Sequence, residues 1–403
     1  MASSSSSEVC NTDTDKSQTQ SQSTSWIEKL PREVYFDVLS RLPFSSLLES
    51  KLVSKRWHAS VKDPGFGNVH VVRASENNLC VLFFFDWPTS KLYLVNFDQR
   101  KNGGALETAK ILKNPFGPAL PDFELVGSCN GLICLYNTES DDQLFVYNPF
   151  ATGYRMLPRM NTHSDSRVSR VVFGFGFHPK TKEYKVIRIV YYAQFNYDFA
   201  GAVPEAFVLS FSNPTWRNIG RIPHMLMGPT SEALVNGKLH WLAIQGETSY
   251  RDIVSFDIET EEFQLVPQPD YDLVNPRDIQ LVTLRGCLSL VVANEIWVTK
   301  TYNVPASWSK EIIIGDYVPP SYRLDMAPPF RRKKNGYQGK ALRVLCALEN
   351  GEILYQYHRR CLVSYNPVSQ EFKDHNVQGL PIEFQAIVHA SSVISVNTVL
   401  GGA

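Results

Sequence analysis

Turn signals that recur along the chain from about residue 67 constrain its fold more than any other feature. The pair Asn-Gly favours a type I′ hairpin because both residues tolerate positive φ. Three such pairs precede the short apolar runs LICLY, KLHWLA and EILYQY, and Arg285-Gly286 before CLSLVV resembles a fourth copy. The three pairs are Asn130-Gly131, Asn236-Gly237 and Asn350-Gly351. These turns predict β-hairpins over most of the chain.

A second turn pattern joins two aromatic residues seven positions apart, across Asn, Asp or His and usually Pro. Its copies are YNPFATGY from Tyr147, FHPKTKEY from Phe177, FDIETEEF from Phe256 and YNPVSQEF from Tyr365, with FSNPTW from Phe211 as a partial copy. Each copy predicts a strand, a tight turn that reverses the chain, and a second strand.

The two patterns together define a repeating unit of antiparallel strands. The units lie near residues 79–113, 125–160, 172–222, 233–269, 280–316 and 344–379. Serial sheets at intervals of about 40–50 residues are typical of a β-propeller, here with about six blades. The segment FQAIVHASSVISV, 384–396, is a candidate for the strand that closes the ring. An open pair of β-sandwiches is the alternative.

The segment that precedes the β-rich region is helical. Val34, Val38 and Leu42 recur at helical spacing. Pro31 suits the first position of a helix, whereas Pro43 cannot continue one. The first of three short helices is therefore expected to end near residue 41.

Two further helices are expected before Asp63-Pro64. Ser46 and Glu49 form a capping-box pattern that restarts a helix. The apolar face of this second helix is expected to contain Leu47, Leu48, Leu52 and Val53, and a third helical turn carries Trp57. A unit of this size buries too little surface to be stable alone, so its apolar faces need a partner.

Composition excludes several classes of function. The formal net charge is zero, so we expect no broad affinity for nucleic acid or anionic membranes. No apolar run reaches membrane-spanning length. Residues 1–24 are rich in Ser, Thr and Gln and are predicted to be disordered. A transit peptide is the alternative, but Glu8, Asp13 and Asp15 argue against it.

Cysteine usage indicates a reducing compartment, the cytoplasm and/or the nucleus. The seven cysteines are odd in number and include no CxxC pair or Cys/His cluster, so we expect neither a disulfide framework nor a metal site. The run GSCNG around Cys129 imitates a nucleophile elbow, which needs a following helix. Here a strand follows, and a hairpin explains the glycines better. We therefore expect no catalytic residue and no cofactor.

Two remaining segments are candidates for contacts with other molecules. Arg331 to Lys334 form a basic cluster in a Pro-rich loop, which is either a solvated loop or a nuclear-import or phosphate-contacting patch. Residues 191–204 are rich in aromatics and form either a strand pair or a loop that presents them to a partner. The candidate substrate-binding residues are Tyr192, Phe195, Tyr197 and Phe199.

The helical segment resembles an F-box, the module that binds the Skp-type adaptor of cullin–RING ubiquitin ligases. The matching residues are Leu30-Pro31, Glu33, Val38-Leu39, Leu42-Pro43, Leu47-Leu48, Val53, Lys55, Trp57, Asp63-Pro64 and Phe66. The stretch SKLVSKRW lacks the Cys or Arg-rich residues that plant F-boxes often have there, but it keeps their apolar spacing.

The β-rich region is similar to the F-box-associated domain of the large plant F-box family. The similarity rests on LVGSCNGLICLYN, LFVYNPFATGYRMLP, FGFGFHPKTKEYKVIRI, ALVNGKLHWLA and VSFDIETEEF. Together the resemblances imply an α+β multidomain chain with a small three-helix F-box and an all-β, propeller-like domain. The implied boundaries are a disordered tail at 1–24, the F-box at 25–66 and a substrate-recruiting domain at 67–403.

The resemblance implies a non-catalytic substrate receptor of a Skp–cullin–F-box (SCF) ubiquitin ligase, with a protein substrate. The expected adaptor contacts are Leu30, Pro31, Val38, Leu39, Leu42, Pro43, Leu47, Leu48, Val53 and Trp57. One alternative is an F-box scaffold that works outside a ligase. Another is a propeller enzyme or carbohydrate-binding module with a helical cap.

Overall fold

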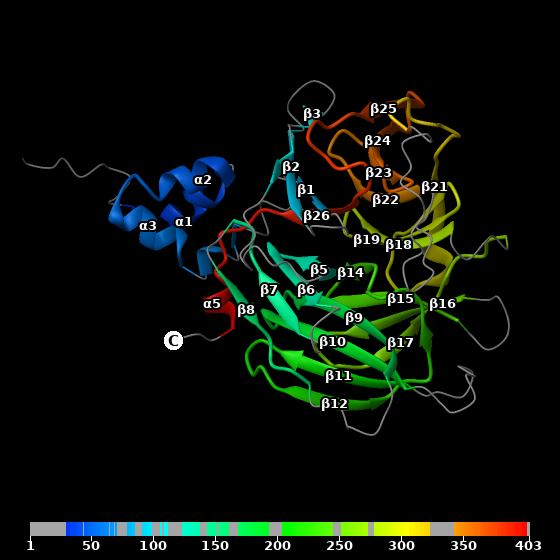
Figure 1. Ribbon diagram of the computed structural model, residues 1–403, viewed down its shortest axis with the longest axis horizontal. Helices are drawn as coiled ribbons and strands as arrows, with labels where there is room; N and C mark the ends of the chain where they lie inside the picture. The colour runs from blue at the N-terminus through cyan, green and yellow to red at the C-terminus, as the bar shows by residue number, and fades with distance from the viewer. Residues whose placement is uncertain are drawn as a thin grey trace, which may run out of the picture.

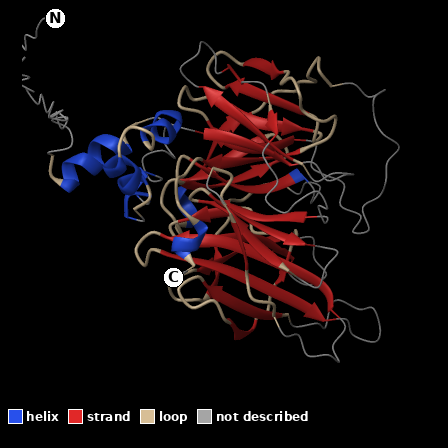
Figure 2. Ribbon diagram, turned by 60° about the vertical axis from the view of Figure 1, so that its left-hand side comes forward, coloured by secondary structure: helices blue, strands red, loops and turns tan. Residues whose placement is uncertain are grey.

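The computed structural model combines an N-terminal group of helices with a large β-domain (Figure 2). It describes residues 30–42, 44–63, 65–67, 69–70, 79–84, 91–98, 105–106, 109–111, 123–137, 143–150, 153–160, 168–192, 204–244, 251–272, 278–322 and 342–400. None of the helices within these ranges is long and apolar enough to cross a membrane. The basic cluster at 331–334 lies outside the described residues.

The helical module, residues 30–70, contains the three predicted helices. They are α1 (Arg32–Ser40), α2 (Phe44–Ser50) and α3 (Lys55–Val61). Helix α2 already begins at Phe44, so the capping box predicted at Ser46 is wrong. The cap that is observed is Ser54, whose hydroxyl accepts the backbone N–H of Trp57 at 3.3 Å and starts α3.

Within the described residues, the strands form six antiparallel sheets arranged as the blades of a ring (Figure 1). This confirms the predicted propeller of about six blades. Blade 1 contains β26 (Gln385–Ala390), β1 (Leu79–Phe84), β2 (Leu92–Asp98), β3 (Ala105–Leu106) and β4 (Lys110–Ile111). Blade 2 contains β5 (Phe123–Cys129), β6 (Leu132–Asn137), β7 (Leu144–Tyr147) and β8 (Tyr154–Met156).

The other four blades follow in chain order. Blade 3 contains β9 (Val168–His178), β10 (Glu183–Tyr192), β11 (Glu205–Ser210) and β12 (Trp216–Arg221). Blade 4 contains β13 (Met225–Leu226), β14 (Ala233–Val235), β15 (Lys238–Ile244), β16 (Arg251–Asp257) and β17 (Phe263–Val266). Blade 5 contains β18 (Ile279–Leu284), β19 (Cys287–Val292), β20 (Glu295–Thr299) and β21 (Trp308–Ile313), with the short helix η4 (Pro305–Ser307). Blade 6 contains β22 (Leu342–Ala347), β23 (Ile353–Tyr357), β24 (Cys361–Asn366) and β25 (Glu371–His375), and helix α5 (Val396–Val399) follows β26.

The predicted hairpin turns are confirmed, and one of the Asn-Gly pairs differs in its turn geometry. Asn130-Gly131, Asn236-Gly237 and Arg285-Gly286 all have positive φ at both positions, as a type I′ turn requires. In the pair Asn350-Gly351 only Gly351 has positive φ, and Leu348 pairs with Glu352 across a longer turn. The copy that starts at Phe177 joins β9 to β10, the first hairpin of blade 3. In this blade the aromatic pattern occupies the first hairpin, where blades 2 and 5 have an Asn-Gly or Arg-Gly turn. The partial copy FSNPTW joins β11 to β12.

Pairing between the two ends of the β-domain closes the ring. Strand β26 pairs with β1 from Leu79 opposite Ala390 to Phe84 opposite Gln385. The inner strands then contact one another all round: β26 with β5, β5 with β9, β9 with β15, β14 with β18, β18 with β22, and β22 with β26. The prediction that residues 384–396 supply a closing strand is therefore confirmed for 385–390.

Two buried glutamines link neighbouring blades where no strand ladder runs between them. The Gln280 side chain donates to the carbonyl of Val344 at 2.8 Å and accepts its N–H at 3.0 Å. Gln356 likewise donates to the carbonyl of Phe384 at 2.5 Å and accepts the N–H of Ala386 at 3.2 Å. Each amide thus substitutes for one rung of a ladder, between blades 5 and 6 and between blades 6 and 1.

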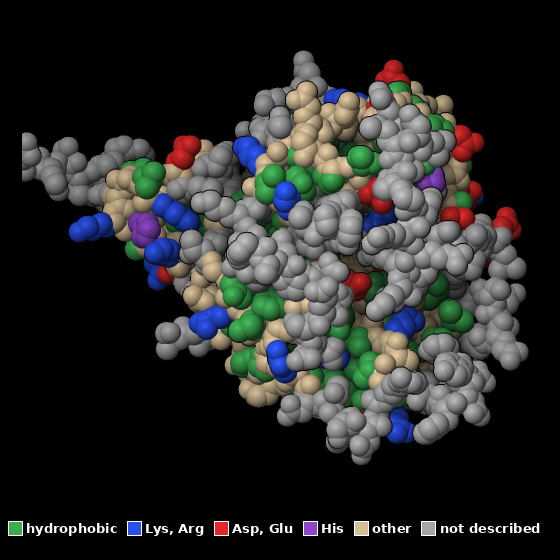
Figure 3. All heavy atoms as spheres, viewed as in Figure 1, with side chains coloured by type: hydrophobic (Ala, Val, Ile, Leu, Met, Phe, Trp, Pro, Cys, Tyr) green, Lys and Arg blue, Asp and Glu red, His purple; other side chains and the backbone are tan. Residues whose placement is uncertain are grey.

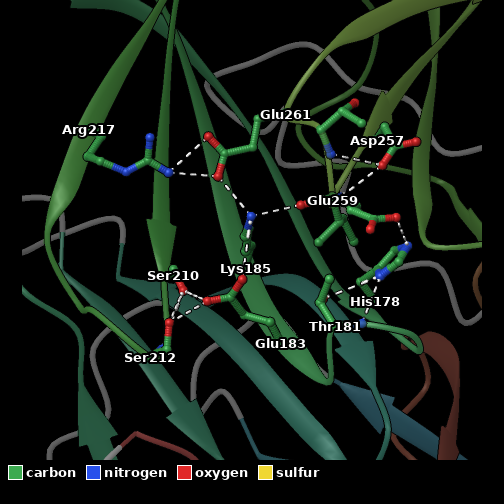
Figure 4. Close-up of polar contacts among 12 residues, drawn as sticks. His178, Thr181, Glu183, Lys185, Ser210, Ser212, Arg217, Asp257, Glu259 and Glu261 are labelled. Atoms are coloured by element: carbon green, nitrogen blue, oxygen red, sulfur yellow. Dashed lines mark hydrogen bonds and ion pairs between the residues drawn. The ribbon is translucent and has the colours of Figure 1, made fainter.

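An ion-pair network joins blades 3 and 4 (Figure 4). Lys185 is 6% exposed, and its ammonium group donates to Glu261 and to the carbonyl of Ile258, both at 2.8 Å. Arg217 donates two further bonds to Glu261, at 2.7 and 2.9 Å. Burial opposes ionisation of Glu261, but its bonds from Lys185 and Arg217 outweigh burial and lower its pKa. The network therefore holds the carboxylate charged.

Three buried histidines are held in the neutral form. Burial lowers the pKa of His240 and of His375 to about 4 and that of His389 to about 3. Each ring has a hydroxyl within hydrogen-bond distance: Tyr302 at 2.8 Å from His240, Ser364 at 3.0 Å from His375 and Ser128 at 2.9 Å from His389.

We expect Gln280→Ala to destabilise the propeller by about 2–4 kcal/mol, because it leaves a buried N–H and a buried carbonyl without partners. Urea unfolding of the full chain measures this loss. The matched control is Gln264→Ala, since Gln264 is exposed on the outer strand of blade 4. Equal stabilities of the two variants would contradict the linking role of Gln280.

The buried histidines predict loss of stability in mild acid. Their pKa values are lower in the folded chain than the unfolded value of about 6.5, so the unfolded chain binds more protons below that pH. Stability should be fully present above about pH 6.5 and fall toward pH 4, by up to about 1.4 kcal/mol per pH unit for each histidine.

Urea midpoints measured between pH 7 and pH 5 test this prediction. His375→Gln should reduce the slope of stability against pH, whereas His58→Gln should not, because His58 is exposed on α3. An unchanged slope in His375→Gln would show that this histidine does not contribute.

Candidate functional site

The helical module has a small core of its own. Tyr35, Leu39, Leu47, Val61 and Phe66 are buried together, and Val393 from the segment after β26 completes the cluster. The rings of Tyr35 and Trp57 pack in a T-shaped arrangement with their centroids 5.9 Å apart. The rings of Phe36 and Phe66 do the same with their centroids 5.3 Å apart. The module is therefore folded around aromatic contacts and touches the propeller on one side.

The ten predicted adaptor contacts differ in their accessibility. Leu39 and Leu47 are fully buried in the module's core. Leu30, Leu42 and Trp57 are half-buried around it, while Pro31, Val38 and Val53 are exposed. Pro43 and the side chain of Leu48 lie outside the described residues. The three exposed residues are the members of the set that a partner reaches without rearrangement of the core.

The module also exposes three large apolar residues that were not predicted as contacts. Val34 on α1 is 46% exposed, Leu52 is 88% exposed and Val69 is 40% exposed. Leu52 and Val53 were expected to line the second helix, but α2 ends at Ser50 and both lie in the turn before α3. The N-cap signal of Ser54, which marks a new helix start, was the sequence feature that pointed to this turn.

Exposed basic side chains follow Leu52 and Val53 closely in the sequence, and Figure 3 shows Lys and Arg spread along the module. Lys55, Arg56 and Lys62 are exposed on or directly after α3. Burial, and then the charge of Lys62, lower the pKa of Lys51. The two ammonium groups therefore repel each other, and an acidic partner would relieve that repulsion.

Tyr192, a candidate substrate residue, lies toward the side of the ring opposite the helical module. Consecutive strands of a blade run antiparallel, so its first and third turns share one side and its second turn lies on the other. Segment 391–400, which contacts the module, follows the end of β26 on the first side. Tyr192 ends β10 and leads into the second turn of blade 3. Figure 2 shows the module at one end of the strands.

Only one of the four candidate substrate residues can be described. The Tyr192 hydroxyl is half-buried and donates to Glu205 at 3.5 Å. Burial and the charge of Glu205 raise the pKa of this phenol, so it stays a neutral donor. Phe195, Tyr197 and Phe199 lie outside the described residues.

The structure places Cys129 in a setting that suppresses nucleophilic chemistry. It ends β5 and precedes the Asn130-Gly131 hairpin, which confirms the hairpin interpretation of this run over a nucleophile elbow. Burial raises the pKa of the Cys129 thiol to about 12. Its thiolate is therefore scarce at neutral pH. No group of three or more metal-ligating side chains occurs within the described ranges.

Comparison with known proteins assigns both parts of the chain. Residues 27–68 match the model of the F-box domain, and residues 83–369 match that of the F-box associated beta propeller domain. The F-box protein At3g07870 of Arabidopsis thaliana is 37% identical over 93% of this chain and 94% of its own length.

Two further relatives from Arabidopsis thaliana are more distant. The F-box protein CPR1 is 28% identical over 70% of this chain and 72% of its own length. The F-box/kelch-repeat protein At3g23880 is 25% identical over 73% of this chain and 83% of its own length. The matched models, the length of the first alignment and the observed blades agree. The chain belongs to the F-box proteins that carry an F-box-associated β-propeller domain.

Proposed function

We propose that this chain is the substrate-recognition subunit of an SCF ubiquitin ligase. The observation that carries the proposal is the exposed apolar surface of an F-box module, with Val38 37%, Val53 63% and Leu52 88% exposed. Such residues rarely stay uncovered in a group, and the exposed lysines and arginines of the module favour a partner with acidic residues. A Skp-type adaptor is the partner that F-box domains generally bind, and through it the chain would join a cullin–RING ligase.

In this role the chain supplies proximity instead of a catalytic group. The module would hold the adaptor on one side of the ring, and a protein substrate would bind on the other, near Tyr192, with Phe195, Tyr197 and Phe199 as further candidate contacts. Holding a substrate lysine close to a charged ubiquitin-conjugating enzyme makes the transfer effectively unimolecular. We propose that this takes place in the cytoplasm and/or the nucleus.

Some of the predicted adaptor contacts are exposed and others are buried, and this difference defines the test. Leu39 and Leu47 are buried, and their truncation would unfold the module. Val38→Asp with Val53→Asp changes exposed positions only. Burying a valine contributes about 1.5 kcal/mol or more, so the loss of two contacts predicts at least about 100-fold weaker adaptor binding.

Calorimetric titration of the full chain with a Skp-type adaptor measures this change. Val368→Asp is the matched control, because Val368 is 92% exposed on blade 6 and far along the chain from the module. Undiminished binding by the double variant would contradict the proposed contact surface. Adaptor binding without cullin-dependent ubiquitination of any co-purified protein would instead support an F-box scaffold outside a ligase.

A further inference from the structure

The segment that follows the ring-closing strand lies between the helical module and blade 2. We call residues 391–400 the C-terminal strap. After β26 ends at Ala390, the strap runs beside the module and continues into α5, which packs on β8 (Figure 1). The ring is already closed by residues 385–390, so the strap is not needed for closure.

Neighbouring residues of the strap are buried in different cores. Val393 is 7% exposed and belongs to the cluster of Tyr35, Leu39 and Phe66 in the module. Ile394 and Val396 are 5% and 2% exposed and belong to the core of blades 2 and 3. The strap therefore has two apolar faces, one for each part of the chain.

Blade 2 holds the backbone of the strap through Asn148, which is fully buried. The Asn148 amide donates to the carbonyls of Ser392 at 3.0 Å and Ile394 at 2.7 Å. Its oxygen accepts the N–H of Phe150 at 2.9 Å, and Phe150 also packs against the module. All polar atoms of this side chain are thus used to fix the strap and the turn beside it.

Two close approaches show that the strap fits without spare room. A Cβ placed on Gly131 would lie 1.9 Å from Cβ of Ser392, and one placed on Gly67 would lie 2.8 Å from Cγ1 of Ile394. The first glycine belongs to blade 2 and the second to the end of the helical module. The strap is therefore in contact with both parts at once, through backbone as well as side chains.

We infer that the C-terminal strap fixes the orientation of the F-box relative to the propeller, with Val393, Asn148 and Phe150 as positioning residues. The chain that leads into β1 is the first connection between the module and the propeller. The strap is a second attachment, which prevents the module from rotating relative to the propeller. The consequence for ubiquitin transfer rests on the proposed function: the strap would set the direction in which the propeller presents a substrate. The rigid attachment itself does not depend on that function.

The test measures the distance between the two parts in the full chain. Spin labels are attached to unnatural amino acids that replace His58 on α3 and Lys300 in blade 5, both of which are exposed. Double electron–electron resonance then measures the distribution of distances between the two labels. The unaltered chain should give one narrow peak. Val393→Asp places a charge in the module's side of the contact and should replace that peak with a broad distribution.

Two further variants keep the result decisive. Val368→Asp is the matched control and should keep the narrow peak. If Val393→Asp fails to fold, Gly67→Val tests the same contact from the module's side, because its side chain would push against Ile394. A narrow, unshifted peak in a folded Val393→Asp or Gly67→Val chain would overturn the inference.

Adaptor titration of the same variants separates this inference from the proposed function. A broad distribution with unchanged adaptor affinity supports the strap and leaves the F-box surface intact. If the unaltered chain gives a narrow peak but does not bind the adaptor, the proposed function is rejected, and the inference that the strap fixes the module is retained.

Discussion

Pairing of β26 with β1 is the interaction on which the rest of the structure depends. It joins residues about 300 positions apart in a single sheet, so the first and last strands of the β-domain belong to one blade and the ring is closed. Inner strands of neighbouring blades approach each other without a continuous ladder, so their buried polar groups need other partners. Gln280 and Gln356 supply such partners to backbone groups, and Ser128 pairs with His389 across blades 2 and 1.

The closed ring also determines which turns lie on the same side of the propeller as the helical module. Because strands within a blade alternate in direction, each side of the ring receives a fixed set of turns. The strand that closes the ring ends on the side of the helical module, and the strap that follows it packs against that module. The second turns of the blades lie on the other side, where Tyr192 ends β10. Separate sides for the adaptor and the substrate follow from this arrangement under the proposed function.

Polar groups in the interior stabilise the propeller only over part of the pH range. The network of Lys185, Arg217 and Glu261 joins blades 3 and 4 as long as the carboxylate is charged, and its lowered pKa extends that condition into acid. The neutral histidines also lose their contribution to stability as the pH falls, because burial opposes their protonation in the folded chain but not in the unfolded chain. Near neutral pH both conditions are met together.

The sequence by itself determined the class of fold and the family. Asn130-Gly131 and Asn236-Gly237 predicted their hairpins correctly, because a type I′ turn depends on the local preference of two residues for positive φ. The copy at Phe177 also predicted its hairpin correctly, but a local aromatic turn does not indicate which two strands of a blade it joins. The spacing of apolar residues identified the F-box. It did not show that Leu39 and Leu47 are buried while Val38 is exposed.

Only the tertiary structure decided how the two parts of the chain are joined. Val393 and Tyr35 are more than 300 residues apart, and no periodicity or turn signal links them. No periodicity or turn signal links Asn148 with Ile394 or Gln280 with Val344 either. Local patterns record the conformation of neighbouring residues, whereas these contacts arise from packing between segments that meet only when the ring has closed.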